Sequence, residues 1–244
     1  MKLREDEFIS TLTTVFKNNG FNKLINLDKA KKFYTLTEYM LAENEKYNLT
    51  AITDPQKIIV FHYLDCAPLA QRLKTNKTVI DVGCGAGFPT LPLAILRDDL
   101  KITAIDSTQK RVDYVARCCE ILELTNVNSV CMRAEDGGKS PEYREKFDYA
   151  TARAVAEMRI ITELCMPYVK IGGSFIAMKG KNAEFELKDA RRAISMIGGK
   201  DAKIENVTLK ANEELIHPLI IIEKKDKTPA AYPRPYAQIS KKPL

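Results

Sequence analysis

The feature that most constrains this chain is a glycine-rich segment that directly follows an apolar run. Residues 79–90 read Val-Ile-Asp-Val-Gly-Cys-Gly-Ala-Gly-Phe-Pro-Thr. Residues 79–82, which are apolar except for Asp81, predict a buried strand, and the glycines at 83, 85 and 87 predict a tight turn that opens a helix. Glycine permits a positive φ and lets a ligand approach the backbone closely. In open α/β sheets ligands bind at the carboxyl ends of strands, so the segment predicts a nucleotide-like ligand here.

Apolar runs and amphipathic helical runs alternate from residue 78 onward. The predicted helices cover 108–123 and lie near 155–169 and 184–197, where apolar residues keep helical spacing. This alternation predicts a mostly parallel sheet with helices on both faces. The last two strands are joined by 210–218, which is too short for a full helix, so we expect an antiparallel hairpin at one edge. The seven predicted strands are Thr78–Val82, Lys101–Ile105, Asn128–Met132, Asp148–Ala152, Gly173–Lys179, Lys203–Leu209 and Leu219–Lys224.

The region before this alternation has a helical pattern. Phe8, Leu12 and Phe16 share one helix face, and Asp28 is a candidate N-cap for a second helix. Residues 48–50 and 54–55 have the composition of turns. We therefore divide the chain into an N-terminal helical extension packed on the core (1–70), the core itself (71–225) and a basic C-terminal tail (226–244).

Composition limits the partners and the location of the protein. No stretch reaches 18 apolar residues and the first residues are rich in acids, so we expect a cytoplasmic protein with no membrane partner. Six cysteines without a C-x-x-C pair, together with two histidines, predict no metal site. The net charge is +6, and six lysines and arginines against one aspartate give the last 21 residues a net charge of +5. This balance permits a nucleic-acid partner without requiring one.

The spacing of the glycines separates two ligand classes. A dinucleotide fingerprint would place its third glycine at position 88, where this chain has Phe88. The form Asp81-x-Gly-x-Gly-x-Gly instead resembles motif I of S-adenosylmethionine enzymes. Asp106, 21 residues after Gly85 and at the end of the next strand, can accept both ribose hydroxyls, although dinucleotide enzymes use a carboxylate in the same way. At the end of the third strand, 133–136 either meets an adenine or forms a solvated charged turn.

Several further stretches, in their order along the chain, carry a closer resemblance: Asn48–Ile52, His62–Cys66, Gly87–Pro92, Thr151–Ala156, Met178–Gly180, Tyr232–Arg234 and Lys241–Leu244. Together they are similar to the bacterial ribosomal RNA small-subunit methyltransferase G family, also called glucose-inhibited division protein B. The resemblance covers nearly the whole chain. It implies a class I, Rossmann-like fold with a seven-stranded mixed sheet. It also implies methyl transfer from S-adenosylmethionine to N7 of a guanine, guanine 527, in 16S rRNA of the small ribosomal subunit or its precursor.

The motifs and the resemblance together name the residues expected at the cofactor: Gly83, Gly85, Gly87, Phe88, Asp106, Ala134, Glu135 and Arg153. Of these, Gly85, Gly87 and Asp106 come from the glycine motif and its acidic partner, and the others from the resemblance. The chain departs from the family pattern where Cys66 replaces a serine and where Ala237 and Ile239 stand at positions that usually hold glycine and proline. These departures affect RNA contacts and the tail, and leave the expected cofactor residues unchanged.

The implied chemistry needs no general base, because guanine N7 carries a lone pair and no proton. We therefore assign no catalytic residue and treat Arg153, Lys179 and His62 as candidates for positioning the substrate. Each has an alternative role. Arg153 could be a surface arginine or bind the cofactor carboxylate, Lys179 could be a solvated lysine, and His62 could be a structural histidine. We expect the basic tail to follow the RNA backbone and the protein to be a monomer.

Two other functional hypotheses remain open from the sequence. The same fold could methylate another RNA, a protein or a small molecule, because the glycine motif does not specify the acceptor. Transfer to an exocyclic amine is disfavoured, since residues 151–155 lack the Asn/Asp-Pro-Pro-aromatic motif typical of that chemistry. A non-catalytic RNA-binding scaffold is the other alternative, and absent cofactor binding would favour it.

Overall fold

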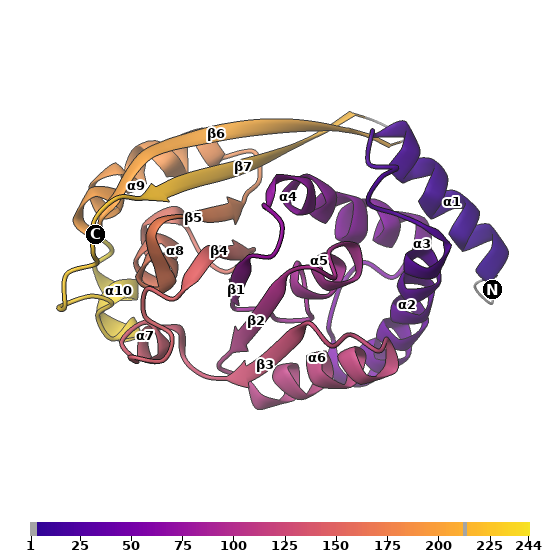
Figure 1. Ribbon diagram of the computed structural model, residues 1–244, viewed down its shortest axis with the longest axis horizontal. Helices are drawn as coiled ribbons and strands as arrows, with labels where there is room; N and C mark the ends of the chain where they lie inside the picture. Colours follow the sequence, from indigo (N-terminus) through magenta and orange to yellow (C-terminus); the bar gives the residue numbers. More distant parts are fainter. Residues whose placement is uncertain (1–3, 212–213) are drawn as a thin grey trace.

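A computed structural model describes residues 4–211 and 214–244 (Figure 1). Its centre is a seven-stranded sheet in the order β3-β2-β1-β4-β5-β7-β6. All neighbouring strands are parallel except β7, which runs antiparallel to both β5 and β6. The strands are β1 (Thr78–Val82), β2 (Lys101–Asp106), β3 (Val127–Cys131), β4 (Phe147–Arg153), β5 (Val169–Met178), β6 (Gly199–Lys210) and β7 (Glu214–Lys224).

Helices cover both faces of the sheet, as the alternating pattern predicts. Successive residues of β1 show why: Val79 belongs to one buried cluster, whereas Ile80 and Val82 belong to the other. Because side chains alternate across a strand, an all-apolar strand needs cover on both sides. The first cluster receives α5 (Thr90–Leu96) and α6 (Gln109–Ile121), and the second receives α8 (Met158–Cys165) and α9 (Ala183–Met196).

The N-terminal region forms two helices that share the first buried cluster with the sheet, α1 (Glu5–Asn18) and α2 (Leu27–Tyr47). Phe8, Leu12 and Phe16 are buried on the predicted face of α1. The N-cap of α2 is Asn26, whose Oδ1 accepts a hydrogen bond from Lys29 N at 2.9 Å. The sequence-based choice of Asp28 was therefore wrong by two residues. Asp28 lies in the first turn instead, where an acidic residue favours the helix dipole.

A run of short helices connects the N-terminal region to β1. The predicted turn at 54–55 is the start of α3 (Pro55–Ile58), because Asp54 Oδ1 caps Lys57 N at 2.9 Å and proline suits the first helical position. One π-helical turn, η1 (Ile59–Tyr63), follows, then η2 (Leu64–Cys66) and α4 (Ala67–Arg72). π-helical turns are rare and frequently mark functional sites.

The last two strands form the expected antiparallel hairpin, but both are longer than the sequence pattern indicates. The pattern missed residues 214–218 of β7, where His217 and Pro218 interrupt the apolar run while the backbone still pairs with β6. The far end of β6 is tied to α1. Asn19 Nδ2 donates to Lys210 O at 2.8 Å, and Lys210 N donates to Asn19 Oδ1 at 2.6 Å. The hairpin thus links the N-terminal helices to the sheet (Figure 1).

The C-terminal segment packs back on the core and ends in α10 (Tyr236–Lys241). Of the six cations in the last 21 residues, two serve inside the protein. Lys224 is 2% exposed, with Nζ donating to Met166 O at 3.0 Å, and Arg234 forms a double ion pair with the buried Glu163 at 2.6 and 2.9 Å. The tail therefore offers fewer cations to solvent than its sequence suggests, and Ile239 of α10 is fully buried.

Candidate functional site

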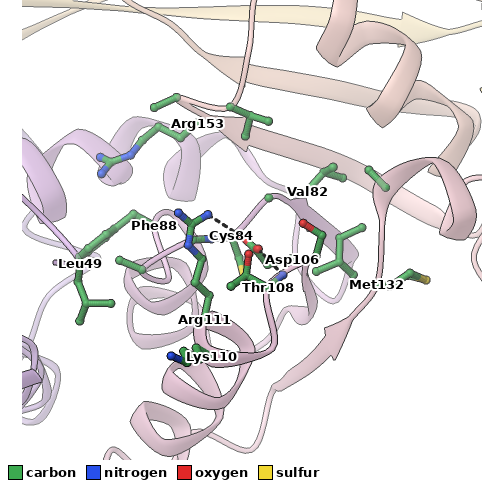
Figure 2. A pocket seen from close by; sticks show the side chains of 18 of the residues that line it. Leu49, Val82, Cys84, Phe88, Asp106, Thr108, Lys110, Arg111, Met132 and Arg153 are labelled. Atoms are coloured by element: carbon green, nitrogen blue, oxygen red, sulfur yellow. Dashed lines mark hydrogen bonds and ion pairs between the residues drawn. The ribbon is translucent and has the colours of Figure 1, made fainter. Parts of the chain in front are cut away.

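A cavity of about 620 Å³ lies at the carboxyl ends of β1, β2 and β4. This is the volume range of small-molecule sites and the end of the sheet where α/β proteins bind ligands. Figure 2 shows Val82, Asp106 and Met132 on one part of its wall, and Leu49, Phe88 and Arg153 on another. We call the first the glycine-loop side, made by Gly83, Gly85, Asp106, Ala134 and Glu135. We call the second the Arg153 side, made by Thr50, His62, Phe88 and Arg153.

The glycine loop turns sharply over the end of β2. Gly83 N and Cys84 N both donate to Ile105 O, at 2.8 and 3.0 Å. The φ angles of the loop glycines are +77° at 83, +54° at 85 and +84° at 87, which L side chains rarely adopt. A Cβ at position 87 would lie 2.5 Å from Leu91 Cδ1, whereas one at position 85 would meet only Gly83 O at 3.9 Å. The loop is thus packed behind and open toward the cavity at Gly85.

Asp106 fixes the loop from the neighbouring strand. Its carboxylate is 5% exposed and accepts hydrogen bonds from Gly85 N at 3.1 Å and Thr108 N at 2.9 Å. Arg111 Nη1 reaches the same group at 3.5 Å (Figure 2). A carboxylate offers about four acceptor positions, so Asp106 braces the loop and keeps capacity for a ligand hydroxyl.

Asp81 lies buried beneath the loop with one oxygen unpartnered. Its Oδ2 accepts a hydrogen bond from Thr90 Oγ1 at 2.6 Å, while Oδ1 has no partner among the described residues. Burial raises the pKa of this carboxyl group to about 6, against the hydrogen bonds from Thr90 that lower it. A buried acceptor without a donor costs free energy, and such groups gather at functional sites.

The third expected element also lines the cavity. Ala134 and Glu135 begin α7 (Ala134–Gly137), directly after β3. Tyr168 holds this turn in place because its hydroxyl donates to Ala134 O at 2.7 Å. The structure therefore brings the glycine loop, Asp106 and the 134–135 turn together around one cavity.

The Arg153 side is built on a stack of three side chains. The His62 and Phe88 rings stack with their centroids 4.4 Å apart, and Arg153 Cζ lies 5.2 Å from the Phe88 centroid. Arg153 donates to Phe61 O at 3.0 Å, to Asp65 Oδ2 at 2.8 Å and to His62 Nδ1 at 3.1 Å. A guanidinium has five N–H donors, so two remain without a partner among the described residues.

Both ring nitrogens of His62 contact neighbouring groups. Nδ1 lies 3.1 Å from Arg153 Nη2, which can only donate, and 3.2 Å from Phe61 O, which can only accept, while Nε2 reaches Thr50 Oγ1 at 2.9 Å. Burial, and then the charge of Arg153, lower the pKa of His62 to about 4. The imidazole is therefore neutral at pH 7, and both of its nitrogens are engaged.

Two residues that sequence reasoning did not assign complete this side. Asp65 bridges Arg153 on β4 and His217 Nδ1 on β7 with its two carboxylate oxygens. Asp65 follows His62 by three residues, so one helical turn presents both to Arg153, and this spacing was a usable signal. No local signal exists for His217, because its partner lies 152 positions earlier in the sequence.

Lys179 and Cys66 lie outside the cavity lining. Lys179 Nζ donates to Ala156 O at 3.0 Å and pairs with Glu186 Oε2 at 2.6 Å, so it ties the segment after β4 to α9. Cys66 is fully buried, and its Sγ donates to His62 O at 3.1 Å. A thiol thus makes the contact that a serine hydroxyl would make here, and burial raises its pKa.

Other kinds of site find no support in the described ranges. Within 4–211 and 214–244, no cluster of three or more histidine, cysteine, aspartate or glutamate side chains is arranged to bind a metal ion. Across the same residues, none of the helices has the length and apolarity needed to cross a membrane.

The strand order, the glycine loop and the carboxylate after β2 define the class I S-adenosylmethionine-dependent methyltransferases. Solved structures share this fold. An S-adenosylmethionine-dependent O-methyltransferase from Thermotoga maritima has a TM-score of 0.53 at 14% identity, over 78% of this chain and 72% of that chain. TYW2 of M. jannaschii in complex with AdoMet has a TM-score of 0.52 at 15% identity, over 67% and 76%. S-Adenosylmethionine is the cofactor of this class.

The family is shown by sequence. Residues 28–216 match the family model described as rRNA small subunit methyltransferase G, and the chain belongs to this family. Its relatives include proteins named ribosomal RNA small subunit methyltransferase G. The one from Clostridium perfringens is 46% identical over 221 residues, which cover 90% of this chain and 92% of that protein. The one from Leuconostoc mesenteroides is 43% identical over 224 residues, which cover 90% and 93%.

Proposed function

We propose that this protein transfers a methyl group from S-adenosylmethionine to N7 of a guanine in 16S rRNA, at guanine 527. The relatives named for ribosomal RNA of the small subunit support the substrate class. One observation carries the proposed chemistry. On the Arg153 side of the cavity, the side chain that normally titrates near neutrality is His62, and both its nitrogens are already hydrogen-bonded. An acceptor atom with a lone pair and no proton fits such a site.

The glycine-loop side fits the cofactor. Gly85 leaves open space in front of the loop, the Asp106 carboxylate has acceptor capacity left, and Asp81 presents an unpartnered oxygen beneath. When bound, S-adenosylmethionine supplies an electrophilic methyl group on a sulfonium sulfur. The residues that would hold it are Gly83, Gly85, Phe88, Asp106, Ala134, Glu135 and Arg153, while Gly87, which was also expected there, packs behind the loop against Leu91.

The Arg153 side would position the guanine rather than activate it. N7 and O6 are the two acceptors on one edge of guanine, and arginine is the side chain that most often pairs with them. If Arg153 bonded N7 it would block the attacking lone pair, so its unused N–H groups suit O6 or the cofactor carboxylate. Holding the acceptor in line with the methyl group supplies rate by proximity and orientation. No proton has to be removed for N7 to react, since it carries none.

The test uses purified protein, methyl-labelled S-adenosylmethionine and small ribosomal subunits from cells that lack this modification. We expect label at a single N7-methylguanine, at position 527, and much less label with Asp106→Ala protein at a cofactor concentration that does not fill its weakened site. Label at another guanine, on another atom or in ribosomal protein would overturn the proposed specificity while keeping the methyltransferase activity. A parallel binding measurement with S-adenosylhomocysteine verifies that each preparation has a competent cofactor site.

A further inference from the structure

Large apolar side chains are exposed at the mouth of the cavity. Tyr47 at the end of α2, Val155 after β4 and Tyr236 on α10 are 43%, 39% and 44% exposed, and all three line the cavity. They are three of the eight large apolar side chains that are exposed in the described chain. Single exposed apolar residues are ordinary, but a group of them around one opening marks a binding surface.

The rings of the two tyrosines are not engaged by other rings of the described chain. They are the two exposed tyrosines among the described residues, and within that part of the chain neither makes a hydrogen bond or a ring contact. Tyr39 and Tyr114, by contrast, stack on each other at 5.8 Å in the interior. The rings of Tyr47 and Tyr236 are therefore free to stack on a ligand.

Cations accompany these rings. Lys110, Arg111 and Arg133 are exposed and line the same cavity. Neither Lys110 nor Arg133 has a side-chain partner among the described residues, and Arg111 makes only the 3.5 Å contact with Asp106. Free cations beside exposed aromatic rings are the combination that binds single-stranded nucleic acid, with phosphates on the cations and bases on the rings.

The two rings also come from widely separated elements. α2 and α10 lie on either side of the central strands (Figure 1), and the cavity that both helices line lies at the carboxyl ends of β1 and β2. A base inside a duplex is already stacked on both faces and offers no free face to a tyrosine. The two tyrosines can therefore stack on the bases of an unpaired strand but not on the bases inside a duplex.

We propose that Tyr47 and Tyr236 stack on nucleobases of an unpaired RNA strand and so keep the target guanine out of its stack and inside the cavity. The inference rests on the proposed function and deepens it, because it states which form of the RNA is the substrate. Both tyrosines are positioning residues, since they act on the orientation of the RNA and take no part in bond formation.

The test compares Tyr47→Ala and Tyr236→Ala with Tyr47→Phe and Tyr236→Phe. Loss of one stacked base costs roughly 1–3 kcal/mol, so KM for the RNA should rise roughly 5- to 100-fold in each alanine variant. The phenylalanine variants should stay near wild type, because stacking needs the ring and not the hydroxyl. Phe185→Ala is the matched control, since Phe185 is 73% exposed on α9 and does not line the cavity.

Two further measurements separate stacking from other roles. S-Adenosylhomocysteine affinity should be unchanged in all four variants. The slope of log RNA affinity against log salt concentration should also be unchanged in these variants. Lys110→Ala should reduce this slope by about one, because one phosphate contact is lost. A short RNA carrying the target guanine in an unpaired loop should be bound more tightly than the same segment closed into a duplex.

The outcomes distinguish this inference from the function on which it rests. If wild-type protein labels no rRNA, the proposed function fails and the inference fails with it. If wild-type protein labels rRNA but both alanine variants have wild-type KM, only the inference is overturned. Equal affinity for the loop and the duplex, or phenylalanine variants as weak as the alanine variants, would also overturn it.

Discussion

The two sides of the cavity are assembled in different ways. The glycine-loop side comes from residues between 83 and 135, in successive strand, turn and helix elements, where Gly85 and its partner Asp106 are 21 positions apart. The Arg153 side joins Phe88 to η1, β4 and the β7 hairpin strand, and the mouth adds the ends of α2 and α10. One side therefore comes from a single stretch of the chain, and the other depends on the complete tertiary fold.

This difference predicts how the two sides respond to change. A substitution on the glycine-loop side should alter cofactor binding and leave the rest of the protein intact. A substitution on the Arg153 side should disturb several distant segments together, because Asp65 alone joins three of them. The following experiments test this contrast.

Arg153→Ala should have the largest effect. It leaves the largely buried Asp65 carboxylate with His217 as its remaining side-chain partner, and breaking a buried ion pair costs roughly 3 kcal/mol of unfolding free energy. Methylation should fall roughly 100-fold or more, as expected when the acceptor is misplaced. Urea denaturation and initial rates measure the two effects. Adding Asp65→Asn to Arg153→Ala should lower the unfolding free energy and the methylation rate little further. Fully additive losses would show that the Arg153–Asp65 ion pair is not the cause of the effect.

Asp106→Ala should affect only the glycine-loop side. The loop N–H of Gly85 and the N–H of Thr108 lose their acceptor, and a hydrogen bond to a charged group contributes roughly 1.5–3 kcal/mol. The dissociation constant for S-adenosylhomocysteine should rise roughly 10- to 100-fold by calorimetry, with RNA affinity unchanged. Asp113→Ala, at an exposed position of α6, is the control. An equal loss of RNA affinity would mean that the sides are not independent.

Asp81→Asn tests the buried carboxyl group through pH. Because burial raises the pKa of Asp81 to about 6, the folded protein holds this proton more tightly than the unfolded chain does. The wild-type protein therefore loses stability from this group as pH rises from about 4 to 6, and the loss persists above 6. The asparagine variant lacks this loss and should be more stable than wild type by about 1 kcal/mol at pH 8.

The expected gain in unfolding free energy is smaller than the raised pKa of Asp81 alone would give. The N–H groups of the new asparagine amide also lack hydrogen-bond partners, and this costs part of the gain. Denaturation at pH 4.5 and pH 8 measures it, and the advantage should shrink at the lower pH. Cofactor affinity should fall in the same variant. A variant that is less stable than wild type at pH 8 would show that the carboxylate is well solvated in the protein.

The smallest loss of ligand affinity is expected from the tail. Lys241→Ala with Lys242→Ala should weaken RNA binding about tenfold and reduce its salt slope by about two, if both lysines contact phosphates. Lys23→Ala with Lys31→Ala, in the loop before α2 and on α2, removes the same charge as a control. Cofactor affinity should stay constant. An unchanged salt slope would remove the tail from the RNA-binding surface.

The sequence predicted the sheet where local pattern decides. The strand from Thr78 to Val82, its glycine turn and the helix at 108–123 agree with the structure within about two residues, because apolar periodicity and turn residues specify them. β7 was shortened since Pro218 normally ends a strand, although here its carbonyl still accepts from Lys179 N at 3.0 Å. The π-helical turn at Ile59–Tyr63 has no sequence signature.

The candidate site divides in the same manner. Every glycine-loop residue named from the motif lines the cavity except Gly87, which packs behind it against Leu91. Lys179 was expected there because it follows a strand end, but its side chain turns to Ala156 and Glu186. Asp65, His217 and Tyr236 were not assigned, since their importance depends on which distant segments meet, and that follows from packing of the whole chain.

The contribution of α10 to the mouth has a consequence for synthesis of the protein. Tyr236 follows Gly87, the last glycine of the loop, by 149 residues, so it leaves the ribosome well after the loop does. Folding during synthesis proceeds from the N-terminus, and the glycine loop and its carboxylate are complete long before that point. The nascent protein thus acquires its glycine loop early and the α10 part of the proposed RNA-binding surface later. A chain that stops after β7 lacks Tyr236 and the Arg234 partner of the buried Glu163.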